Sequence, residues 1–501
     1  MAVEISGEPQ LWDSTALFLG QDLKVLMEGA GSALAHHLRT HYPDHLVRGL
    51  LVVAGLGGNG GDGAVAARHL AHLFPVEIWL LGKPSQATHG AALENFRLAA
   101  SSPWIRVMEV TSEEELRELA FPEGGLILDA ILGRGQKGPA RGLPRAAIQR
   151  LAALHADVPI VSVDVPSGYP FEPHVRPREV VAFQWDAGDG HPFPKVLYPI
   201  GFLPETRHLV GPGHVRPLLG RPGAHKGQNG DLLVLGGSEA YPGAPLLSAL
   251  AAAPFVDRVW LGRPQGGPLP PQLIPMPLGV PAAIWEERHL PEVEEVLDRV
   301  TAVVVGPGMG RHPTTLGFLQ RFLKKIEGRG LPMVVDADAL EAMEPSDFRP
   351  WLLTPHAGEA RRLWERVFSS PYPAKEGLTV NEELFLRREA LRRLSLHLGV
   401  TLLGKGPLDV AVQEEKWLYN ITGNRGLTAG GTGDVLAGLA GAFLAQGQDP
   451  LLAGAGAAFL VGLAGEALWE TQGFSFTASD VAALLPQVAG RLLQGENFPR
   501  R

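Results

Sequence analysis

The sequence predicts an α/β protein with two domains, and three observations lead to this prediction. Apolar runs of strand length alternate with helical stretches along the chain. Such a βαβα order is typical of a mainly parallel sheet with helices on both faces. The length of 501 residues is too great for one ordinary core, and a segment rich in Gly and Pro separates two such series.

Four strands are expected in the first series. They are LLVVAG (50–55), VEIWLL (76–81), GLILDAIL (125–132) and IVSVDV (160–165), separated by helix-like stretches such as AVAARHLAHLF (64–74) and RAAIQRLAALH (145–155). Sheets of this kind bind ligands at the carboxyl ends of their strands. The polar residues at or just after those ends are therefore candidate site residues: Asn59, Asp129, Asp164 and Ser167.

The boundary between the domains is expected in GPGHVRPLLGRPGAH (211–225), which has little periodic pattern. The predicted domains are therefore residues 1–215 and 216–501. The second domain has strand candidates in DLLVLGGS (231–238), DRVWLG (257–262), AVVVGPGMG (302–310), MVVDADAL (333–340), LLTPHAGE (352–359) and VTLLGKG (400–406), and it ends in an apolar helical region.

Composition narrows the class of protein. Hydrophobic residues at 45% and charged residues at 19% are typical of a soluble globular chain, and the net charge of −9 gives no reason to expect nucleic acid. Without any cysteine the chain has no disulfide, thiolate metal site or cysteine nucleophile. Residues 1–10 lack a signal-peptide core, and the apolar run 451–465 is shorter than the roughly 20 residues of a membrane span. We expect a buried helix there and a cytoplasmic protein with no membrane partner.

The loop within VVAGLGGNGGDGAVAARHL (52–70) contains a literal G-x-G-x-x-G. That pattern is the dinucleotide-binding fingerprint, but the fingerprint also needs an acidic residue about 20 positions on, at the end of the next strand. Glu77 stands at the start of that strand, and Asp62 would bring negative charge towards a pyrophosphate. An oxidoreductase loop and a glycine turn that only packs a strand on a helix remain alternatives. We favour a loop that lines a site with Asn59.

Four motifs of the first half resemble a known family. LMEGAG (26–31), GGNGGDGAVAARHL (57–70), LDAILGRG (128–135) and VDVPSG (163–168) are similar to the N-terminal, epimerase half of the NAD(P)H-hydrate repair proteins, over roughly residues 10–210. The resemblance implies a Rossmann-like α/β/α domain. Gly58 and the segment 169–185 depart from the family pattern, which usually has a second asparagine at 58 and a glycine and regular strand after the PSG.

The same resemblance implies the chemistry of this half. A K⁺ ion would be held by Asn59, Asp129 and Ser167. Asp164 would be the acid/base for epimerisation at C6 of the hydrated nicotinamide, NAD(P)HX. The residues implied to contact that substrate are Gly58, Asn59, Gly60, Gly61, Asp62, Gly133, Arg134, Gly135, Gln136, Lys137, Gly138 and Asp164.

The second half carries NITGNRGLTAGGTGDVLAGLAGAFLAQG (420–447). Gly430, Gly431 and Gly433 let the backbone approach a ligand, and Asp434 opens an apolar helix. Free N–H groups and the dipole at a helix start bind phosphate oxygens. An aspartate there can orient or deprotonate a hydroxyl that attacks the phosphate. A plain N-cap aspartate is the alternative.

Five further motifs follow in one order: HKGQNGDLLVLGGSEAYPGAPLLSALA (225–251), VVGPGMG (304–310), VVDADAL (334–340), LLTPHAGEARRL (352–363) and LLGKGPLDVAV (402–412). With GGTGDVLAG they resemble the NAD(P)H-hydrate dehydratase domain, the ribokinase-like half of the same proteins, over residues 220–490. Departures at 251 onward, at Glu341 and at Arg425 are expected to lie away from the chemistry.

The resemblance implies ADP-driven dehydration of S-NAD(P)HX to NAD(P)H, with release of AMP and phosphate. Asp434 would activate the C6 hydroxyl. ADP is the expected donor, as in bacterial fused members, with ATP as the eukaryotic habit. Asp336 and Asp338 would help to order Mg²⁺. The substrate would lie near Ala244, Gly310, His356 and Asp434, and the nucleotide near Lys405, Gly406, Pro407, Leu408, Asp409 and Gly433.

The fusion of the two halves is consistent with one half interconverting epimers and the other dehydrating one of them. Two alternatives remain. One is a ribokinase-class kinase of a vitamin precursor, and the other is a dehydratase whose N-terminal half is a non-catalytic ligand-binding or docking module. A homo-oligomer is expected because the family tends to assemble.

Overall fold

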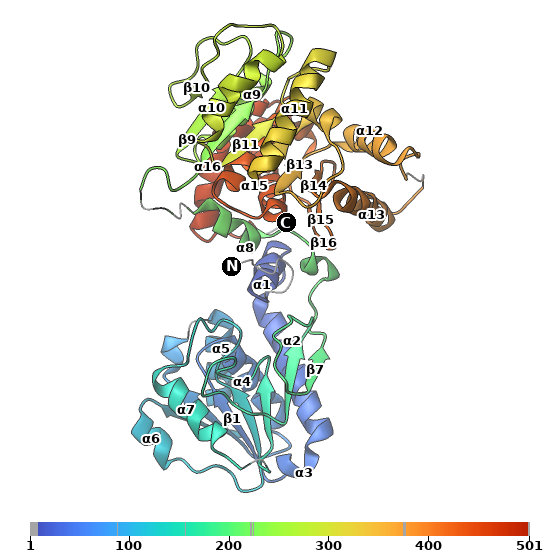
Figure 1. The fold of residues 1–501 in the computed structure, drawn as a ribbon. Helices are drawn as coiled ribbons and strands as arrows, with labels where there is room; N and C mark the ends of the chain where they lie inside the picture. Colours follow the sequence, from blue (N-terminus) through green and yellow to red (C-terminus); the bar gives the residue numbers. More distant parts are fainter. Residues whose placement is uncertain are drawn as a thin grey trace. The chain divides into compact units, whose positions relative to one another are not determined.

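The computed structural model describes residues 9–87, 89–155, 157–220, 223, 225–373 and 377–498. The chain forms two compact units that meet in sequence between Thr206 and Arg207, and Figure 1 shows the elements of each. We call them the N-terminal unit and the C-terminal unit. The Gly/Pro-rich segment 211–225 begins inside the C-terminal unit, where it forms the short helix α8 (Pro212–Val215) and the 3-10 turn η3 (Arg216–Leu219).

The N-terminal unit is built on a seven-stranded sheet with the order β3-β2-β1-β4-β5-β6-β7, and all of its described pairings are parallel. The four strands expected from the sequence are confirmed as β1 (Leu50–Ala54), β2 (Val76–Leu81), β4 (Leu126–Ala130) and β5 (Ile160–Val163). The sheet also contains β3 (Ile105–Val110), β6 (Glu179–Phe183) and β7 (Lys195–Tyr198). A regular strand therefore does follow the VDVPSG motif.

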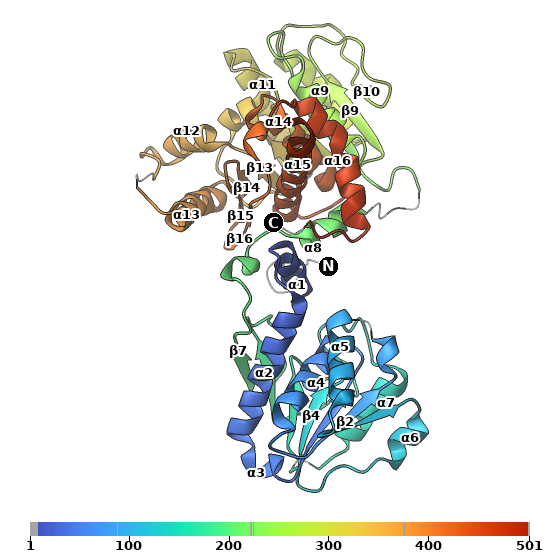
Figure 2. The same cartoon turned by 180° about the vertical axis from the view of Figure 1, so that it is seen from behind.

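Helices cover both faces of this sheet, as Figures 1 and 2 show. Side chains alternate along β1, so that Val52 joins one core and Val53 the other. The first core is closed by α2 (Leu23–His41), α4 (Gly58–Leu70) and α5 (Gly90–Ser101), and the second by α6 (Glu113–Glu118) and α7 (Gly142–Ala152). The remaining short elements are α1 (Pro9–Phe18), α3 (Pro43–Leu46), η1 (Pro84–Gln86) and η2 (Pro204–Arg207).

The C-terminal unit has a nine-stranded sheet with the order β10-β9-β8-β11-β12-β13-β14-β15-β16. The expected strands are confirmed as β8 (Asp231–Leu235), β9 (Arg258–Gly262), β11 (Ala302–Val305), β12 (Met333–Val335), β13 (Trp351–Leu353) and β14 (Thr401–Gly404). They run parallel, together with β10 (Ile274–Pro275). The sheet ends in an antiparallel hairpin, β15 (Asp409–Gln413) and β16 (Lys416–Asn420), which the sequence did not predict.

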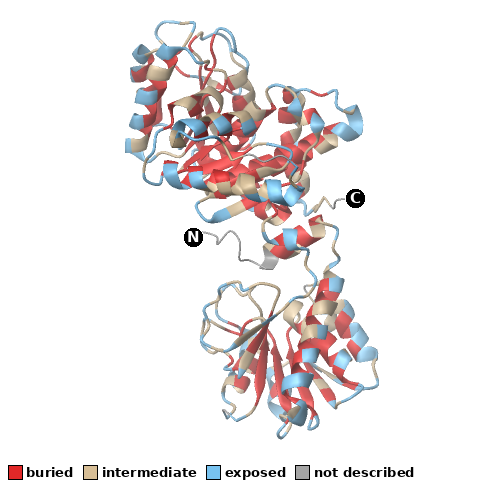
Figure 3. Cartoon of the chain, turned by 90° about the vertical axis from the view of Figure 1, so that its right-hand side faces the viewer, coloured by how far each residue is buried: buried red, intermediate tan, exposed pale blue. Residues whose placement is uncertain are grey.

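Helices also cover both faces of the second sheet. One face carries α9 (Ala244–Ala252), α14 (Thr432–Ala445), α15 (Pro450–Gln472) and α16 (Ala478–Leu493), which lie nearer the viewer in Figure 2. The other carries α10 (Leu290–Leu297), α11 (Pro313–Arg329), α12 (Ala357–Phe368) and α13 (Val380–Leu398). Short 3-10 turns are η4 (Glu287–His289), η5 (Ala337–Ala342) and η6 (Arg425–Thr428). Buried residues fill the space between layers in each unit (Figure 3).

Helix α15 is longer than the apolar run from which it was expected. It has 23 residues and would be long enough and apolar enough to cross a membrane, but 83% of its most apolar window is buried inside the protein. A helix that is apolar on all sides belongs in the core of a domain. The expectation of a buried helix at 451–465 is therefore confirmed, although its expected length was too short.

Close packing of α14 depends on glycines, and this gives a testable prediction. A Cβ on Gly438 would overlap the backbone carbonyl of Ser248 in α9, whereas a Cβ on Gly490 in α16 would meet nothing within 4 Å. We expect Gly438→Ala to lower the free energy of unfolding by about 1–3 kcal/mol. Gly490→Ala, the matched control, should raise it by about 0.5–1 kcal/mol because alanine favours the helix. Urea unfolding measures both, and a Gly438→Ala protein as stable as the wild type would contradict the prediction.

Candidate active sites

A cavity of about 160 Å³ lies at the carboxyl ends of the strands of the N-terminal unit. Five of the residues expected to bind substrate line it: Gly58, Asn59, Asp62, Arg134 and Asp164. Trp12, Trp185 and Phe202 form an aromatic part of its wall that the sequence analysis did not predict. The indole rings of Trp12 and Trp185 meet edge-on, with centroids 5.0 Å apart. The cavity therefore combines carboxyl groups with an apolar surface that suits a planar ring.

Asp164 follows directly after β5 and has a φ of 66°. This left-handed conformation is uncommon for a residue other than glycine, and such conformations gather at functional sites. The Arg134 guanidinium holds the side chain, because its Nε donates to Asp164 Oδ1 at 3.0 Å. Arg134 Nη2 also pairs with Asp189 Oδ2 at 2.8 Å. Arg134 thus links the loop after β4 to the loop after β5.

Two further carboxyl groups face Asp164 in this cavity. Burial raises the pKa of Asp13 to about 6, and the charge of Asp164 adds to the rise. Burial also raises the pKa of Asp62 well above its ordinary value, with contributions from Asp164 and Asp13. Asp62 therefore holds a proton more tightly than an exposed aspartate does, while Asp164 has the Arg134 guanidinium as its partner.

The three residues expected to hold K⁺ lie together at the ends of β1, β4 and β5. The Asn59 amide donates to the carbonyl of Leu132 at 3.3 Å, and Ser167 Oγ donates to the same carbonyl at 3.1 Å. The Ser167 backbone N–H donates to the Asp129 carboxylate at 2.9 Å. Burial raises the pKa of the fully buried Asp129, while hydrogen bonds from Ser167 and Ser162 oppose that rise. The three side chains form one hydrogen-bonded cluster of hard oxygen donors.

The other glycines of the first loop have packing roles. A Cβ on Gly60 would overlap the Gly55 carbonyl, and one on Gly61 would press on Met27, so both positions need the absence of a side chain. Gly133 approaches the Asn59 amide in the same way. Of the loop 133–138, the described cavity wall includes Arg134 alone, while Gly135 and Lys137 are exposed and the Gln136 amide donates to the Gly138 carbonyl at 2.6 Å.

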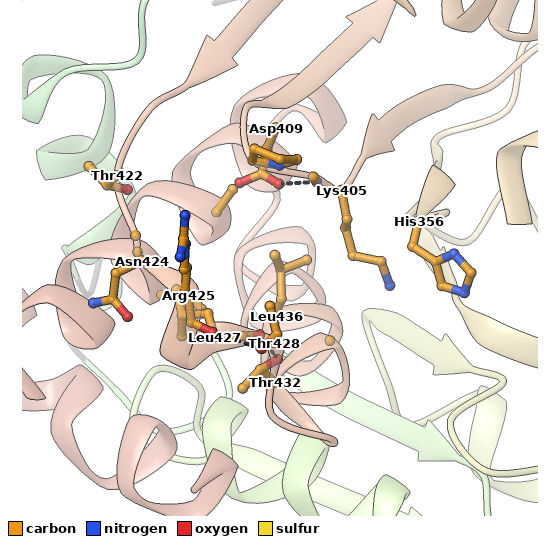
Figure 4. Close-up of a pocket in the computed structure, with 17 residues that line it drawn as sticks. His356, Lys405, Asp409, Thr422, Asn424, Arg425, Leu427, Thr428, Thr432 and Leu436 are labelled. Carbon is orange, nitrogen blue, oxygen red and sulfur yellow. Dashed lines mark hydrogen bonds between the residues drawn. The ribbon is translucent and has the colours of Figure 1, made fainter. Parts of the chain in front are cut away.

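A larger cavity of about 760 Å³ lies in the C-terminal unit. Its wall includes His356, Lys405, Gly406, Pro407, Asp409 and Gly433, all expected site residues. Figure 4 shows Lys405 and His356 on one side of the cavity and Thr422, Asn424 and Arg425 on the other. Gly406 N donates to Asp409 Oδ1 at 3.0 Å, and this bond fixes the turn between β14 and β15. Leu408 belongs to the turn but not to the cavity wall.

Lys405 is the charged centre of this region. It follows β14, and its Nζ donates to Asp336 Oδ1 at 2.8 Å. Burial works to lower the pKa of Lys405, but the carboxylates of Asp336, Glu359 and Asp434 outweigh it, so the pKa lies above its ordinary value. A cation that stays charged at a cavity wall can bind phosphate oxygens.

Asp434 lies in the first turn of α14, next to Gly433 of the cavity wall. The N-cap Gly431 has a φ of 95°, which glycine adopts at little steric cost. Burial raises the pKa of Asp434 to about 7, and Asp336 adds to the rise while Lys405 opposes it. A carboxyl group with this pKa exchanges a proton readily near neutral pH.

The remaining expected substrate residues lie outside the large cavity. Gly310 borders a separate hollow of about 330 Å³ with Asp338 and Glu341, and its N–H donates to Asp338 Oδ2 at 2.9 Å. Ala244 begins α9, from which Ser248 Oγ donates to the Asp434 carbonyl at 2.8 Å.

Asp336 and Asp338 are the acidic groups that were expected to help to order Mg²⁺. Within the described ranges, three or more His, Asp or Glu side chains are nowhere grouped so as to hold a metal ion. Asp336 accepts from Lys405 and from the Thr354 hydroxyl, and Asp338 pairs with Arg311 Nε at 2.9 Å. Any Mg²⁺ here would need oxygen ligands from a bound phosphate as well, which is its usual coordination.

Sequence reasoning missed or misplaced several residues of this site. Arg425 lines the large cavity and Glu341 the smaller hollow, although both were expected to lie away from the chemistry. Arg387 of α13 donates to the carbonyls of Gly404 and Leu408, each at 2.6 Å, and so holds the 404–408 loop from behind. No local motif marks Arg387, because it comes from a helix that ordinary amphipathic patterning explains.

The pKa of Asp434 gives a prediction about stability. Its folded-state pKa, about 7, lies above the unfolded value near 3.8, so its contribution to stability falls as pH rises between these values. Asp434→Asn should therefore be more stable than the wild type. The difference in the free energy of unfolding should grow from pH 4 to pH 7 and then level off at no more than about a few kcal/mol, and thermal unfolding at a series of pH values measures it.

Asp480→Asn is a control of opposite sign, because hydrogen bonds from Thr477 lower the pKa of Asp480. That variant should be less stable than the wild type at neutral pH, and the difference should shrink as pH falls below 4. A stability difference for Asp434→Asn that does not change with pH would contradict the prediction.

Two family models match the chain. The model for NAD(P)H-hydrate dehydratase matches residues 232–487, and the model for the YjeF-related protein N-terminus matches residues 23–187. A solved structure, the ADP/ATP-dependent NAD(P)H-hydrate dehydratase from Bacillus subtilis co-crystallized with ATP/Mg²⁺, is 25% identical with a TM-score of 0.43, and the match covers 57% of this chain and 98% of that one.

Curated relatives match over nearly the whole length. The bifunctional NAD(P)H-hydrate repair enzyme Nnr of Pyrobaculum aerophilum is 35% identical over 505 residues, covering 96% of both chains. The enzyme of the same name from Methanothermobacter thermautotrophicus is 34% identical over 502 residues, covering 95% of this chain and 93% of the relative. By these matches over both units, the chain belongs to the family of bifunctional NAD(P)H-hydrate repair enzymes.

Proposed function

We propose that this protein restores hydrated NADH and NADPH to the intact cofactors in two reactions. The N-terminal unit interconverts the R and S epimers of NAD(P)HX, and the C-terminal unit dehydrates the S epimer with ADP. The observation that carries the proposal is the grouping of Asp434 with Lys405 at the start of α14, beside a cavity of about 760 Å³. A base and a phosphate-binding cation side by side suit phosphoryl transfer.

In the C-terminal unit, Asp434 takes the proton of the C6 hydroxyl as the hydroxyl oxygen attacks the terminal phosphoryl group of ADP. AMP leaves and C6 then carries a phosphate. Electron donation from N1 breaks the C6–O bond, phosphate departs with its electron pair, and loss of a proton from C5 restores the C5–C6 double bond. Because such transition states are mostly loose, positioning by Lys405 and by the α14 N–H groups matters more than a strong base.

Lys405 and the N-terminus of α14 would contact the phosphates, and the turn 405–409 would lie along the nucleotide. Mg²⁺ would be held by the phosphates with help from Asp336 and Asp338, and when bound it would neutralise charge on the transferring group. The cavity side formed by Thr422, Asn424 and Arg425 would receive the rest of the nucleotide.

In the N-terminal unit, Asp164 would exchange a proton with the C6 hydroxyl while the ring opens and closes. The Arg134 ion pair keeps Asp164 oriented for this task. K⁺ would be held by Asn59, Asp129 and Ser167, whose oxygen donors suit a hard cation. When bound, it would balance the buried Asp129 carboxylate and tie the three strand-end loops together. The aromatic wall would lie against the nicotinamide ring.

The competing functions differ in what they require of the chain. A vitamin-precursor kinase would use the same Asp434 and Lys405, but it would release a stable phosphorylated product and would have no use for the N-terminal cavity. A dehydratase with a non-catalytic N-terminal module would leave R-NAD(P)HX untouched. The expected homo-oligomer and cytoplasmic location stay predictions.

One assay separates these functions. A mixture of both epimers of hydrated NADH is incubated with the protein, Mg²⁺ and ADP, with ATP in parallel, and the absorbance of reduced nicotinamide is followed. We expect two phases, first consumption of the S epimer and then of the R epimer at the rate of its epimerisation. If the second phase were no faster than uncatalysed epimerisation, the N-terminal unit would be only a binding module. No recovery with either nucleotide would favour the vitamin kinase.

Two variants assign the phases to the two units. Asp434→Asn should slow the dehydration by about 10²–10⁴-fold, the range expected for loss of an acid/base group. It should leave epimerisation of purified R-NADHX, followed by NMR, unchanged. Asp164→Asn should have the reverse effect, with a normal first phase and no catalysed second phase.

Arg387 should act as a positioning residue for the nucleotide loop. Arg387→Lys keeps the charge but cannot bridge the carbonyls of Gly404 and Leu408, so the loop loses one hydrogen bond. We expect KM for ADP to rise by roughly tenfold with kcat within about twofold, since one hydrogen bond contributes about 1–1.5 kcal/mol. Arg388→Lys is the matched control, because Arg388 stacks on Phe385 and Trp417 instead. Equal KM values for the two variants would contradict this role.

A further inference from the structure

The N-terminal cavity contains a third carboxyl group, Asp13, which lies outside every motif of the sequence analysis. We propose that Asp13 is a second catalytic residue of this site, exchanging a proton with N1 of the hydrated ring while Asp164 exchanges one with the C6 hydroxyl. The proposal rests on the epimerase function proposed above and adds a residue to it.

The position of Asp13 follows from the packing of α1. Trp12, its neighbour, is buried with its ring against Trp185, and Trp185 in turn lies against Phe202 with centroids 5.7 Å apart. This aromatic group fixes α1 at the cavity, and both Trp12 and Asp13 line the wall. A ring stacked on these aromatic groups would have Asp13 beside it.

The charges of the cavity leave Asp13 without a partner to neutralise it. Three carboxyl groups, Asp13, Asp62 and Asp164, line the wall together with His89 and one guanidinium, that of Arg134. Arg134 pairs with Asp164 and with Asp189, which stands behind it. In the part of the chain that the structure describes, the Asp13 side chain makes no hydrogen bond or ion pair.

The three carboxyl groups have different surroundings in the cavity. Asp164 has a cation beside it, whereas burial holds the pKa of Asp62 well above its ordinary value. Burial and the charge of Asp164 raise the pKa of Asp13 to about 6. Carboxyl groups whose environments push their pKa values apart divide the roles of acid and base. Asp13 can thus both give and regain a proton near neutral pH.

Epimerisation needs such a pair of groups. As the ring opens, Asp164 accepts the proton of the C6 hydroxyl, and the O–H electron pair forms the C6=O double bond. The C6–N1 bond breaks, and N1 keeps its electron pair and takes the proton of Asp13. Rotation about the C5–C6 bond presents the other face of the aldehyde. N1 then adds to C6 and returns its proton to Asp13, while the oxygen regains a proton from Asp164.

The two-phase assay tests this role in the full-length protein. We expect Asp13→Asn to leave the first phase unchanged and to slow the second by about 10²–10⁴-fold, with KM for R-NADHX within about threefold of the wild type. The kcat/KM of epimerisation by the wild type should change with an apparent pKa near 6, and this inflection should be absent from Asp13→Asn. His89, Asp62, Asp164 and Arg134 also face the cavity and are the same in both proteins, so the two pH profiles differ only through Asp13.

Controls keep the outcomes distinct. Asp44→Asn removes an exposed carboxylate of the same unit and should behave as the wild type. Asp13→Glu keeps a carboxyl group and should recover part of the second phase. A second phase that persists in Asp13→Asn, or one lost only through a higher KM, would overturn the proposal. The proposal would also be overturned if Asp13→Asn and Asp13→Glu both lost the second phase and, with it, the near-ultraviolet circular dichroism signal of packed aromatic side chains, because the role of Asp13 would then be structural. A wild type without a second phase would instead refute the epimerase function itself.

Discussion

The direction of the strands is the constraint on which both sites depend. Every described pairing in the N-terminal sheet is parallel, as are the pairings from β10 to β14 in the C-terminal sheet. Parallel strands end at one common edge, so polar residues that follow different strands gather there although they are far apart in sequence. Asn59 and Asp164 meet in this way in the first unit, and Asp336 and Lys405 meet in the second.

Both sites bring more carboxyl groups together than cations. In the first, Arg134 pairs with Asp164 while burial raises the pKa of Asp62, and in the second, Lys405 pairs with Asp336 while Asp434 has a pKa of about 7. Like charges in a partly buried space cannot all ionise, so one carboxyl group is left able to exchange a proton. The clustered carboxyl groups lower the free energy of unfolding, and the same groups provide the acid/base chemistry.

The sequence predicted those parts of the molecule that local patterns encode. Apolar runs located the strands, and the turns after them located Asp164, Lys405 and their neighbours. Residues supplied by helices, such as Asp13 and Arg387, were missed, because an amphipathic helix has the same pattern whether or not one of its polar residues faces a cavity. Gly60 and Gly61 were expected to contact substrate, and they also have a packing role that only three-dimensional contacts reveal. The β15–β16 hairpin was missed because β15 begins only a few residues after the strand-end motif at Lys405, where the pattern was interpreted as a binding loop.

The two hydrogen bonds from Arg387 to the 404–408 loop have a consequence for the kinetics of nucleotide capture. A loop that is already held in place by the fold loses little conformational entropy when a ligand arrives. Encounter then needs no slow rearrangement of the loop, so the association rate should be set mainly by diffusion and by the charge of Lys405 at the cavity wall. In that case the fold controls turnover through the dissociation of the spent nucleotide rather than through the association of a fresh one.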